Sequence, residues 1–181
     1  MSSTDRKIVF YCTGFLIILS LWLIICAAEL TAFSLLKSAI LITCSYIAMI
    51  FDINAKRIPN MLVLIMITMW VLLIIPMLVL DAGKGFGILT DSIYGLLLGG
   101  GLFLLVYVIS KKGLGGGDVK FMAAAGLYLG FAGTIPAILY GTVLAAVTGI
   151  VLILLKKIKR KDPIPLAPFL FAGIMISVFS S

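Results

Sequence analysis

Two aspartates stand at the edges of long apolar runs, where an ionisable side chain calls for an explanation. Asp52 closes one run, in SYIAMIFDINAKRIPN, and Asp118 opens another, in GLGGGDVKFM. Two carboxylates brought close together cannot both ionise, so one holds a proton at neutral pH while the other stays charged. The charged member can activate water as a general base, and the protonated member can hydrogen-bond a carbonyl as a general acid. The pair therefore suits aspartyl proteolysis.

Position alone leaves an ordinary interpretation open for both residues. Each can be an interfacial acid neutralised by Lys56, Arg57 or Lys120, because acids at helix ends reach water at little cost. The sequence lacks the residues that other hydrolytic mechanisms need. The chain has no histidine, which removes Ser-His and Cys-His catalysis and the usual zinc sites. A Ser-Lys dyad is not indicated either, since Ser38 directly follows Lys37 and adjacent helix positions do not face each other.

The cysteines suggest no metal or disulfide chemistry. Cys12, Cys26 and Cys44 are singletons inside apolar runs, and no CxxC spacing occurs. They are typical of small buried side chains. We expect neither a metal nor a cofactor.

A glycine cluster, Gly113-Leu114-Gly115-Gly116-Gly117, directly precedes Asp118. Each such glycine costs roughly 0.5 to 1 kcal/mol relative to alanine, so a mere connector would be better served by other residues. We expect the cluster to allow positive φ angles, close approach of a bound backbone, and movement of Asp118. A phosphate-binding loop is a competing interpretation, but no GK[ST] follows the glycines and an aspartate repels phosphate.

The composition predicts an integral membrane protein. Hydrophobic residues make up 63% of the 181 residues, charged residues 12%, and the mean hydropathy is +1.29. Lipid offers no partners for backbone polar groups, so apolar runs of about 20 residues must be helices. We predict an all-α bundle of about seven (six to seven) transmembrane helices, forming a single domain over residues 1–181 with no soluble domain. The runs lie at residues 8–28, 33–51, 61–80, 88–109, 119–133, 134–155 and 164–179.

The first run also resembles a signal peptide, because Arg6 and Lys7 precede it and Cys26-Ala27-Ala28 has small residues like a cleavage site. Its apolar stretch is longer than the ~7 to 15 residues of such a peptide, which favours a retained helix.

The basic residues predict the orientation. If the amino terminus is cytoplasmic and the helices alternate, only Lys37 and Lys84 of the fourteen Lys and Arg residues fall outside. This topology places Asp52 and Asp118 at the same cytoplasmic face of the cell membrane. The net charge of +7 then reflects topology and contact with anionic membrane lipids, and nucleic-acid binding is not indicated.

The same topology gives the other acids ordinary explanations. Asp5 and Asp162 fall in cytoplasmic flanks, Glu29 and Asp81 in external loops, and Asp91 in the first turn of the fourth helix at its external end. Two glycine pairs, Gly95 with Gly99 and Gly126 with Gly130, each share a helix face, which predicts close helix packing.

Three motifs carry a resemblance to a known family. Gly115-Gly116-Gly117-Asp118 matches the GxGD signature of intramembrane aspartyl proteases, and GGGDVKFMAAAGLYLG resembles the corresponding segment of type IV prepilin peptidases. FDINAKRIPN is similar to that family's first aspartate segment, and IPLAPFL at 164–170 is similar to the proline-rich start of its last helix. The motifs occur in the family's order between residues 46 and 170.

The resemblance implies a leader peptidase that cuts the basic leader of type IV pilin-like or archaeal flagellin-like precursors, with Asp52 and Asp118 as its catalytic pair. Larger members carry a cytoplasmic domain with paired CxxC motifs and also N-methylate the new amino terminus. This sequence contains neither that domain nor its paired cysteines, so we expect peptidase activity without N-methylation. The pilin substrate, the cleavage site and the oligomeric state stay open.

Several neighbouring residues are candidates for supporting roles. Gly115 and Gly117 would shape the loop beside Asp118, and Lys120 would tune it or contact an acidic group of the substrate, although a topology-setting lysine is an equal interpretation. Pro59 and Asn60 are expected to start the third helix. Pro165 and Pro168 are the remaining candidates, because irregular backbone there would offer a groove for an extended substrate segment.

Two other functions compete with proteolysis. A small proton- or cation-coupled transporter would place acids near the membrane midplane and interrupt helices in matching halves. A non-catalytic pilin assembly factor would keep the bundle and be indifferent to the loss of either aspartate.

Overall fold

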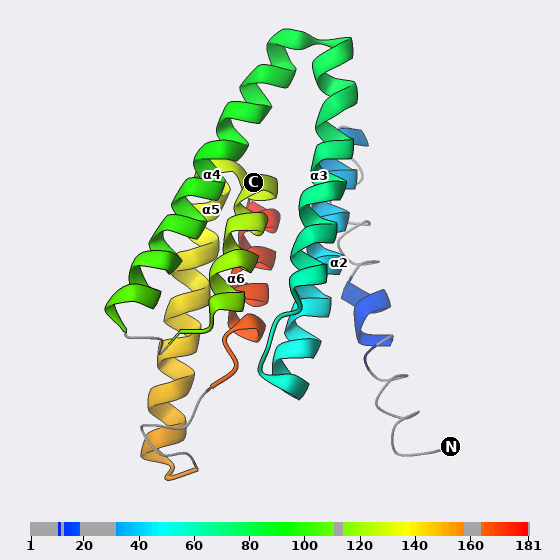
Figure 1. Ribbon diagram of the computed structural model, residues 1–181. Coiled ribbons are helices and arrows are strands. Elements are labelled where there is room, and N and C mark those ends of the chain that lie inside the picture. The colour runs from blue at the N-terminus through cyan, green and yellow to red at the C-terminus, as the bar shows by residue number, and fades with distance from the viewer. Residues whose placement is uncertain (1–10, 12, 19–31, 111–113, 158–163, 181) are drawn as a thin grey trace.

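The computed structural model describes residues 11, 13–18, 32–110, 114–157 and 164–180, and every regular element within these ranges is helical (Figure 1). Four helices are long and apolar enough to cross a membrane, which confirms the prediction of an all-α membrane bundle. The first run lies largely outside the described residues, as do Asp5, Glu29 and Asp162. The labelled helices are α2 (Ala32–Ala55), α3 (Asn60–Leu80), α4 (Ala82–Ile109), α5 (Gly116–Leu154) and the shorter α6 (Ala167–Ser180).

Helix α5 consists of two legs that turn back on each other at Gly130. This glycine has φ +69° and ψ −176°, values that interrupt the helix. A Cβ built on Gly99 of α4 would lie 2.6 Å from the Met122 carbonyl oxygen and 3.4 Å from Thr134 Cγ2. Twelve residues of straight helix span about 18 Å, so only a reversal brings both residues to one point. Figure 1 shows the first leg rising and the second descending.

This hairpin accounts for the fifth and sixth predicted runs. The break falls at Gly130, whereas the sequence placed the boundary between residues 133 and 134. The chain resumes its helix at Phe131, so Pro136 lies near the start of the second leg.

The predicted glycine faces do meet, and they join α4 to the first leg of α5. A Cβ on Gly95 would overlap the carbonyl oxygens of Gly126 and Gly130, and a Cβ on Gly126 would overlap the Gly95 carbonyl. Lipid is as apolar as a leucine side chain, so membrane helices associate through such close backbone contact. The pairing fixes the first leg, which carries Asp118 at its start.

Helix α6 is held between the second leg of α5 and α2. A Cβ on Gly173 would overlap the Ala137 carbonyl, and the Ser177 hydroxyl donates to the Gly133 carbonyl at 2.7 Å. On the other side, the rings of Phe171 and Tyr46 of α2 meet edge to face at 5.7 Å. The start of α6 is thereby placed beside the end of α2.

Asp91 lies elsewhere than the sequence predicted. Helix α4 begins at Ala82, where Asp81 caps it by accepting a hydrogen bond from the Lys84 N–H, so Asp91 is well past the first turn. Its Oδ1 accepts a hydrogen bond from the Phe131 N–H at 3.0 Å, at the start of the second leg of α5. A carboxylate there satisfies an orphan donor and favours the positive end of the helix dipole. Asp91 therefore stabilises the hairpin turn.

Alanine substitution should separate the packed glycines from the lipid-facing ones. We expect Gly95→Ala to lower the free energy of unfolding by about 1–3 kcal/mol, because the added methyl group meets the backbone of α5. Gly101 of the same helix has nothing within 4 Å, so Gly101→Ala should leave stability unchanged or raise it by up to about 1 kcal/mol. Unfolding of the purified proteins in detergent, followed by circular dichroism, measures both. Equal stability of the two variants would contradict this packing.

Candidate active site

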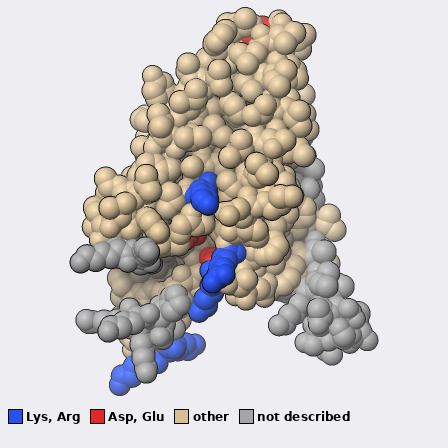
Figure 2. Space-filling view, in the orientation of Figure 1, with Lys and Arg blue, Asp and Glu red and all other residues tan. Residues whose placement is uncertain are grey.

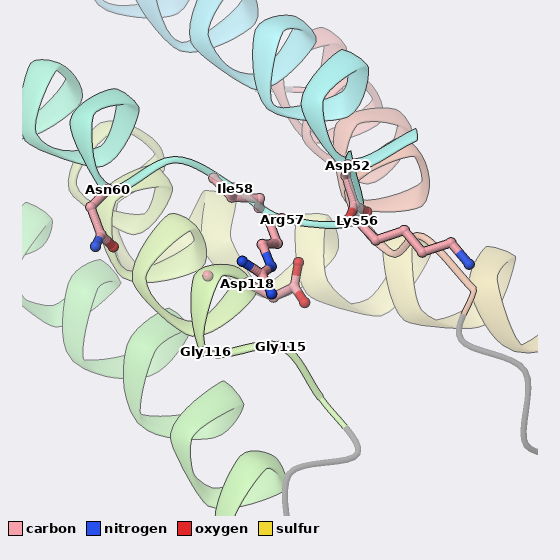
Figure 3. Close-up of a pocket in the computed structure, with 9 residues that line it drawn as sticks. Asp52, Lys56, Arg57, Ile58, Asn60, Gly115, Gly116 and Asp118 are labelled. Carbon is pink, nitrogen blue, oxygen red and sulfur yellow. The ribbon is translucent and has the colours of Figure 1, made fainter. Parts of the chain in front are cut away.

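Asp52 and Asp118 line one pocket of about 390 Å³ at one end of the bundle. Asp52 belongs to the last turns of α2 and Asp118 to the first turn of α5. The linker between α2 and α3 forms another wall of the pocket. Figure 3 shows the side chains that line it. The lining residues are Asp52, Lys56, Arg57, Ile58, Asn60, Gly115, Gly116, Gly117 and Asp118.

Asp52 is buried and bound to the start of α6. The residue is only 6% exposed, and its Oδ2 accepts a hydrogen bond from the Ala167 N–H at 2.9 Å. Ala167 is the first residue of α6, where orphan N–H groups and the helix dipole favour a negative charge. The contact supplies the partner that a buried carboxylate requires.

The prolines near α6 lie outside the lining of the pocket. Pro168 has no N–H, and the N–H groups of Phe169 and Leu170 both donate to the Leu166 carbonyl, at 3.0 and 3.1 Å. The Ala167 N–H, at the first position of the helix, has no intrahelical acceptor and donates to Asp52. Neither Pro165 nor Pro168 lines the pocket.

The glycines before Asp118 make room for side chains. A Cβ on Gly115 would lie 2.8 Å from Asp118 Oδ2, and a Cβ on Gly117 would lie 3.2 Å from Ile58 Cβ. Gly116 has open space around it. Gly115, the N-cap of α5, has φ −72°, and Gly130 is the one described glycine with positive φ. The expectation of positive φ is therefore wrong for residues 115–117, and close approach is the physical reason for glycine at 115 and 117.

The linker between α2 and α3 brings further residues to the pocket. Pro59 caps α3 in an extended conformation and Asn60 begins the helix, which confirms the predicted start. Ile58 is buried, whereas Arg57 and Lys56 are exposed at the pocket wall. Lys56 has φ +50°, and its N–H donates to the Asp52 carbonyl as α2 ends. The turn thus positions Asp52 and the basic pair together.

Lys120 contacts Asn60 instead of lining the pocket. Its Nζ donates to Asn60 Oδ1 at 3.0 Å, which ties the start of α5 to the start of α3. On the same leg, the Tyr128 hydroxyl donates to the Met66 carbonyl of α3 at 2.6 Å. These two contacts hold the leg that carries Asp118 against α3.

The ordinary interpretation of the two acids predicted neutralisation by nearby cations. Within the described ranges, neither aspartate forms an ion pair with Lys56, Arg57 or Lys120. Figure 2 shows acidic atoms in a hollow of the surface with basic side chains on either side. Sequence reasoning did not count Lys56, Arg57, Ile58 and Gly116 as site residues, although all of them follow within one or two turns of Asp52 or adjoin Asp118.

The arrangement can supply a base and an acid to one bound group. One carboxylate is buried against a helix start, the other stands beside a glycine-formed opening, and both face the same pocket. The fold and the site together define a multi-helix membrane protein with a carboxylate pair at one end of its bundle.

Comparison with known sequences gives the family. The chain belongs to the type IV leader peptidase family, whose sequence model matches residues 39–150. It is 32% identical to the prepilin leader peptidase/N-methyltransferase of Xanthomonas campestris pv. campestris over 133 residues, which cover 73% of this chain and 46% of the relative.

Two other relatives match over shorter stretches. The prepilin leader peptidase/N-methyltransferase of Bacillus subtilis is 35% identical over 48% of this chain and 37% of its own length. The leader peptidase HopD of Escherichia coli is 35% identical over 47% of this chain and 59% of its own length. The chain spans about half the length, or less, of most of the curated relatives it matches. No solved structure matches it.

Two substitutions of Asp52 should separate its structural contact from its charge. Asp52→Ala leaves the buried Ala167 N–H without its acceptor, and we expect a loss of about 1–3 kcal/mol in the free energy of unfolding. Asp52→Asn keeps an acceptor oxygen for the Ala167 N–H, loses the charge and exchanges the second oxygen for an NH2 group, so its loss should stay below about 1 kcal/mol. Thermal unfolding in detergent compares the two variants. Equal losses would show that the bond to α6 contributes little.

Proposed function

We propose that this protein is a membrane-embedded aspartyl endopeptidase that removes the leader of type IV pilin-like precursors. The observation that carries the proposal is the meeting of Asp52 and Asp118, from helices far apart in sequence, in one pocket. Membership of the leader peptidase family supports the same activity. Relatives named prepilin leader peptidase suggest the substrate class.

The roles of the two carboxylates follow from their surroundings. We assign the general base to Asp52, because the Ala167 N–H and the α6 dipole stabilise its charged form. Asp52 takes a proton from water, the water oxygen bonds to the scissile carbonyl carbon, and Asp118 gives its proton to the carbonyl oxygen. When the resulting gem-diol collapses, the C–N bond breaks, the proton on Asp52 passes to the leaving nitrogen, and a hydroxyl proton returns to Asp118. No covalent intermediate forms.

The location of the site suggests where cleavage occurs. Lys56, Arg57 and Lys120 lie around the same end of the bundle, and the excess of basic residues there supports a cytoplasmic location. We propose that the protein lies in the cell membrane and cuts the precursor at its cytoplasmic face, after a basic leader. Membrane lipids and precursor proteins are the partners that this placement implies.

Asparagine substitution of either aspartate should abolish cleavage. We expect Asp52→Asn and Asp118→Asn to lower kcat/KM by at least about 10²–10⁴-fold, since each removes one proton-transfer group. The assay incubates a purified pilin precursor with each purified variant in lipid and reads the product mass, which also reports any methylation of the new amino terminus.

The matched control is Asp81→Asn, at the opposite end of the bundle, where asparagine caps a helix as well as aspartate does. It should cleave like the wild type. Cleavage indifferent to Asp52 and Asp118 would overturn the dyad and return attention to the assembly-factor interpretation, and proton-coupled uptake into vesicles would favour a transporter.

The glycine beside Asp118 offers a finer test of the geometry. Gly115→Ala should lower cleavage by about a hundredfold, because the added methyl group pushes against Asp118 Oδ2 and displaces the carboxylate. Gly101→Ala, in α4 and outside the pocket lining, meets nothing within 4 Å and should retain activity. Both variants are assayed on the same precursor. Similar activity in the two would show that the carboxylate position near Gly115 does not matter to the reaction.

A further inference from the structure

Asp91 is an ionisable residue inside the bundle that the proposed reaction does not use. It lies nine residues after Ala82, the first residue of α4, and therefore roughly 14 Å from the end of the bundle opposite the candidate active site. The turn that it contacts, at Gly130, lies twelve residues after Asp118, or roughly 18 Å from that site. The two lengths together match the ~30 Å core of a bilayer, so Asp91 lies well within the membrane. Charged residues at such depth are costly and mark a function.

The Asp91 carboxylate lies against the turn of α5 with both oxygens. Its Oδ1 accepts the Phe131 N–H at 3.0 Å. A Cβ built on Gly130 would overlap Oδ2, so the carboxylate occupies the space in which another residue type would carry its side chain. Lys37 of α2, which forms no direct ion pair within the described ranges, attracts this carboxylate at longer range. Such a compensating cation is what a charged residue inside a membrane requires.

The second leg of α5 and α6 pack through a ladder of close contacts. On each helix the contacting residues recur every four positions, so they share one face. The Gly133 carbonyl accepts the Ser177 hydroxyl at 2.7 Å, a Cβ on Gly173 would overlap the Ala137 carbonyl, and a Cβ on Gly141 would lie 3.1 Å from the Phe169 carbonyl oxygen.

This ladder runs from the turn of α5 to the candidate active site. It begins three residues after Gly130 and ends two residues after Ala167, whose N–H binds Asp52. Contacts in which backbone atoms take part leave little free space to absorb a shift. A displacement of the turn therefore passes along the leg to the start of α6.

We propose that Asp91 is a positioning residue for the carboxylate pair, because it holds the turn from which the ladder places α6 and its donor to Asp52. The inference rests on the proposed peptidase function. Asp91 does not line the catalytic pocket, so it acts through these contacts and not on the substrate. A misplacement of about 1 Å can lower a rate about a hundredfold, and a loosened turn would produce such a misplacement at the far end of the leg.

The test compares two aspartates that accept hydrogen bonds at different helix starts. Asp91→Ala removes the acceptor of the Phe131 N–H, and Asp91→Asn keeps an acceptor oxygen there. The matched control is Asp81→Ala, which removes the acceptor of the Lys84 N–H at the start of α4. For each purified variant in lipid, kcat and KM are measured separately on a pilin precursor. The temperature is one at which circular dichroism shows every variant to be folded.

We expect Asp91→Ala to lower kcat about a hundredfold and to leave KM nearly unchanged, because the pocket wall still binds the substrate while the reacting groups are displaced. Asp91→Asn should lower kcat by less than about fivefold, the scale of one charge at a helix start. Asp81→Ala should cleave like the wild type, since the bond that it removes lies at the far end of α4.

Thermal unfolding tests the path from Asp91 to Asp52 without any substrate. Losses of stability at sites this far apart normally add. Because we expect Asp91 to act through the donor to Asp52, the double variant Asp91→Ala/Asp52→Ala should lose less in unfolding temperature than the sum of the two single losses. The double variant Asp81→Ala/Asp52→Ala should lose the full sum.

Several results would overturn the inference. Equal kcat in Asp91→Ala and Asp81→Ala would limit Asp91 to a structural role, and full additivity of Asp91→Ala with Asp52→Ala would refute the path. A raised KM at unchanged kcat would assign Asp91 to substrate binding. An equal loss of kcat in Asp91→Asn and Asp91→Ala would assign the effect to the charge and not to the held turn.

Two further outcomes are decided separately. If Asp91→Ala does not fold, Asp91→Glu replaces it, because the longer side chain keeps the charge but moves the turn. It should then lower kcat more than Asp91→Asn does, and wild-type activity in Asp91→Glu would refute the positioning role. No cleavage by the wild type would refute the peptidase function, while the unfolding experiment would still decide whether Asp91 places the donor to Asp52.

Discussion

The hydrogen bond between the Ala167 N–H and Asp52 Oδ2 is the contact on which the candidate site depends. A buried carboxylate needs a donor, and the start of α6 supplies it. The place of α6 depends on the second leg of α5, and that leg begins where Asp91 accepts the Phe131 N–H. Asp91 thus holds the hairpin turn of α5. The position of that turn in turn helps to place α6, whose first N–H binds Asp52.

Glycine serves three separate physical needs in this bundle. Gly95 and Gly126 lack side chains so that two helices can touch through their backbones. Gly130 adopts a left-handed φ that reverses the chain. Gly115 has an ordinary φ and leaves space for a carboxylate. Glycine in this sequence therefore marks close helix packing, a reversal of the chain, or space for a neighbouring carboxylate. Each of these roles is tested by a different substitution.

The sequence predicted the class of fold and the common end of the two aspartates, because apolar length and basic-residue bias follow from the membrane itself. It also predicted the glycine faces, since i to i+4 spacing fixes a helix face whatever the partner. The donor to Asp52 and the cap by Asp91 could not be predicted, because each joins residues from distant segments whose contact only the packed bundle decides. The spacing of Asp91 four residues before Gly95 was a usable signal that it faces α5. The catalytic roles of Asp52 and Asp118 stay predictions.

The bond to α6 occupies one of the two oxygens of Asp52, and this has an evolutionary consequence. Aspartate and asparagine codons differ by one base, and asparagine keeps an oxygen in the position that α6 uses. A lineage can therefore lose the proposed chemistry in one mutational step while the architecture survives intact. A protein that binds a precursor without cutting it can therefore evolve from this one without any intervening sequence that fails to fold.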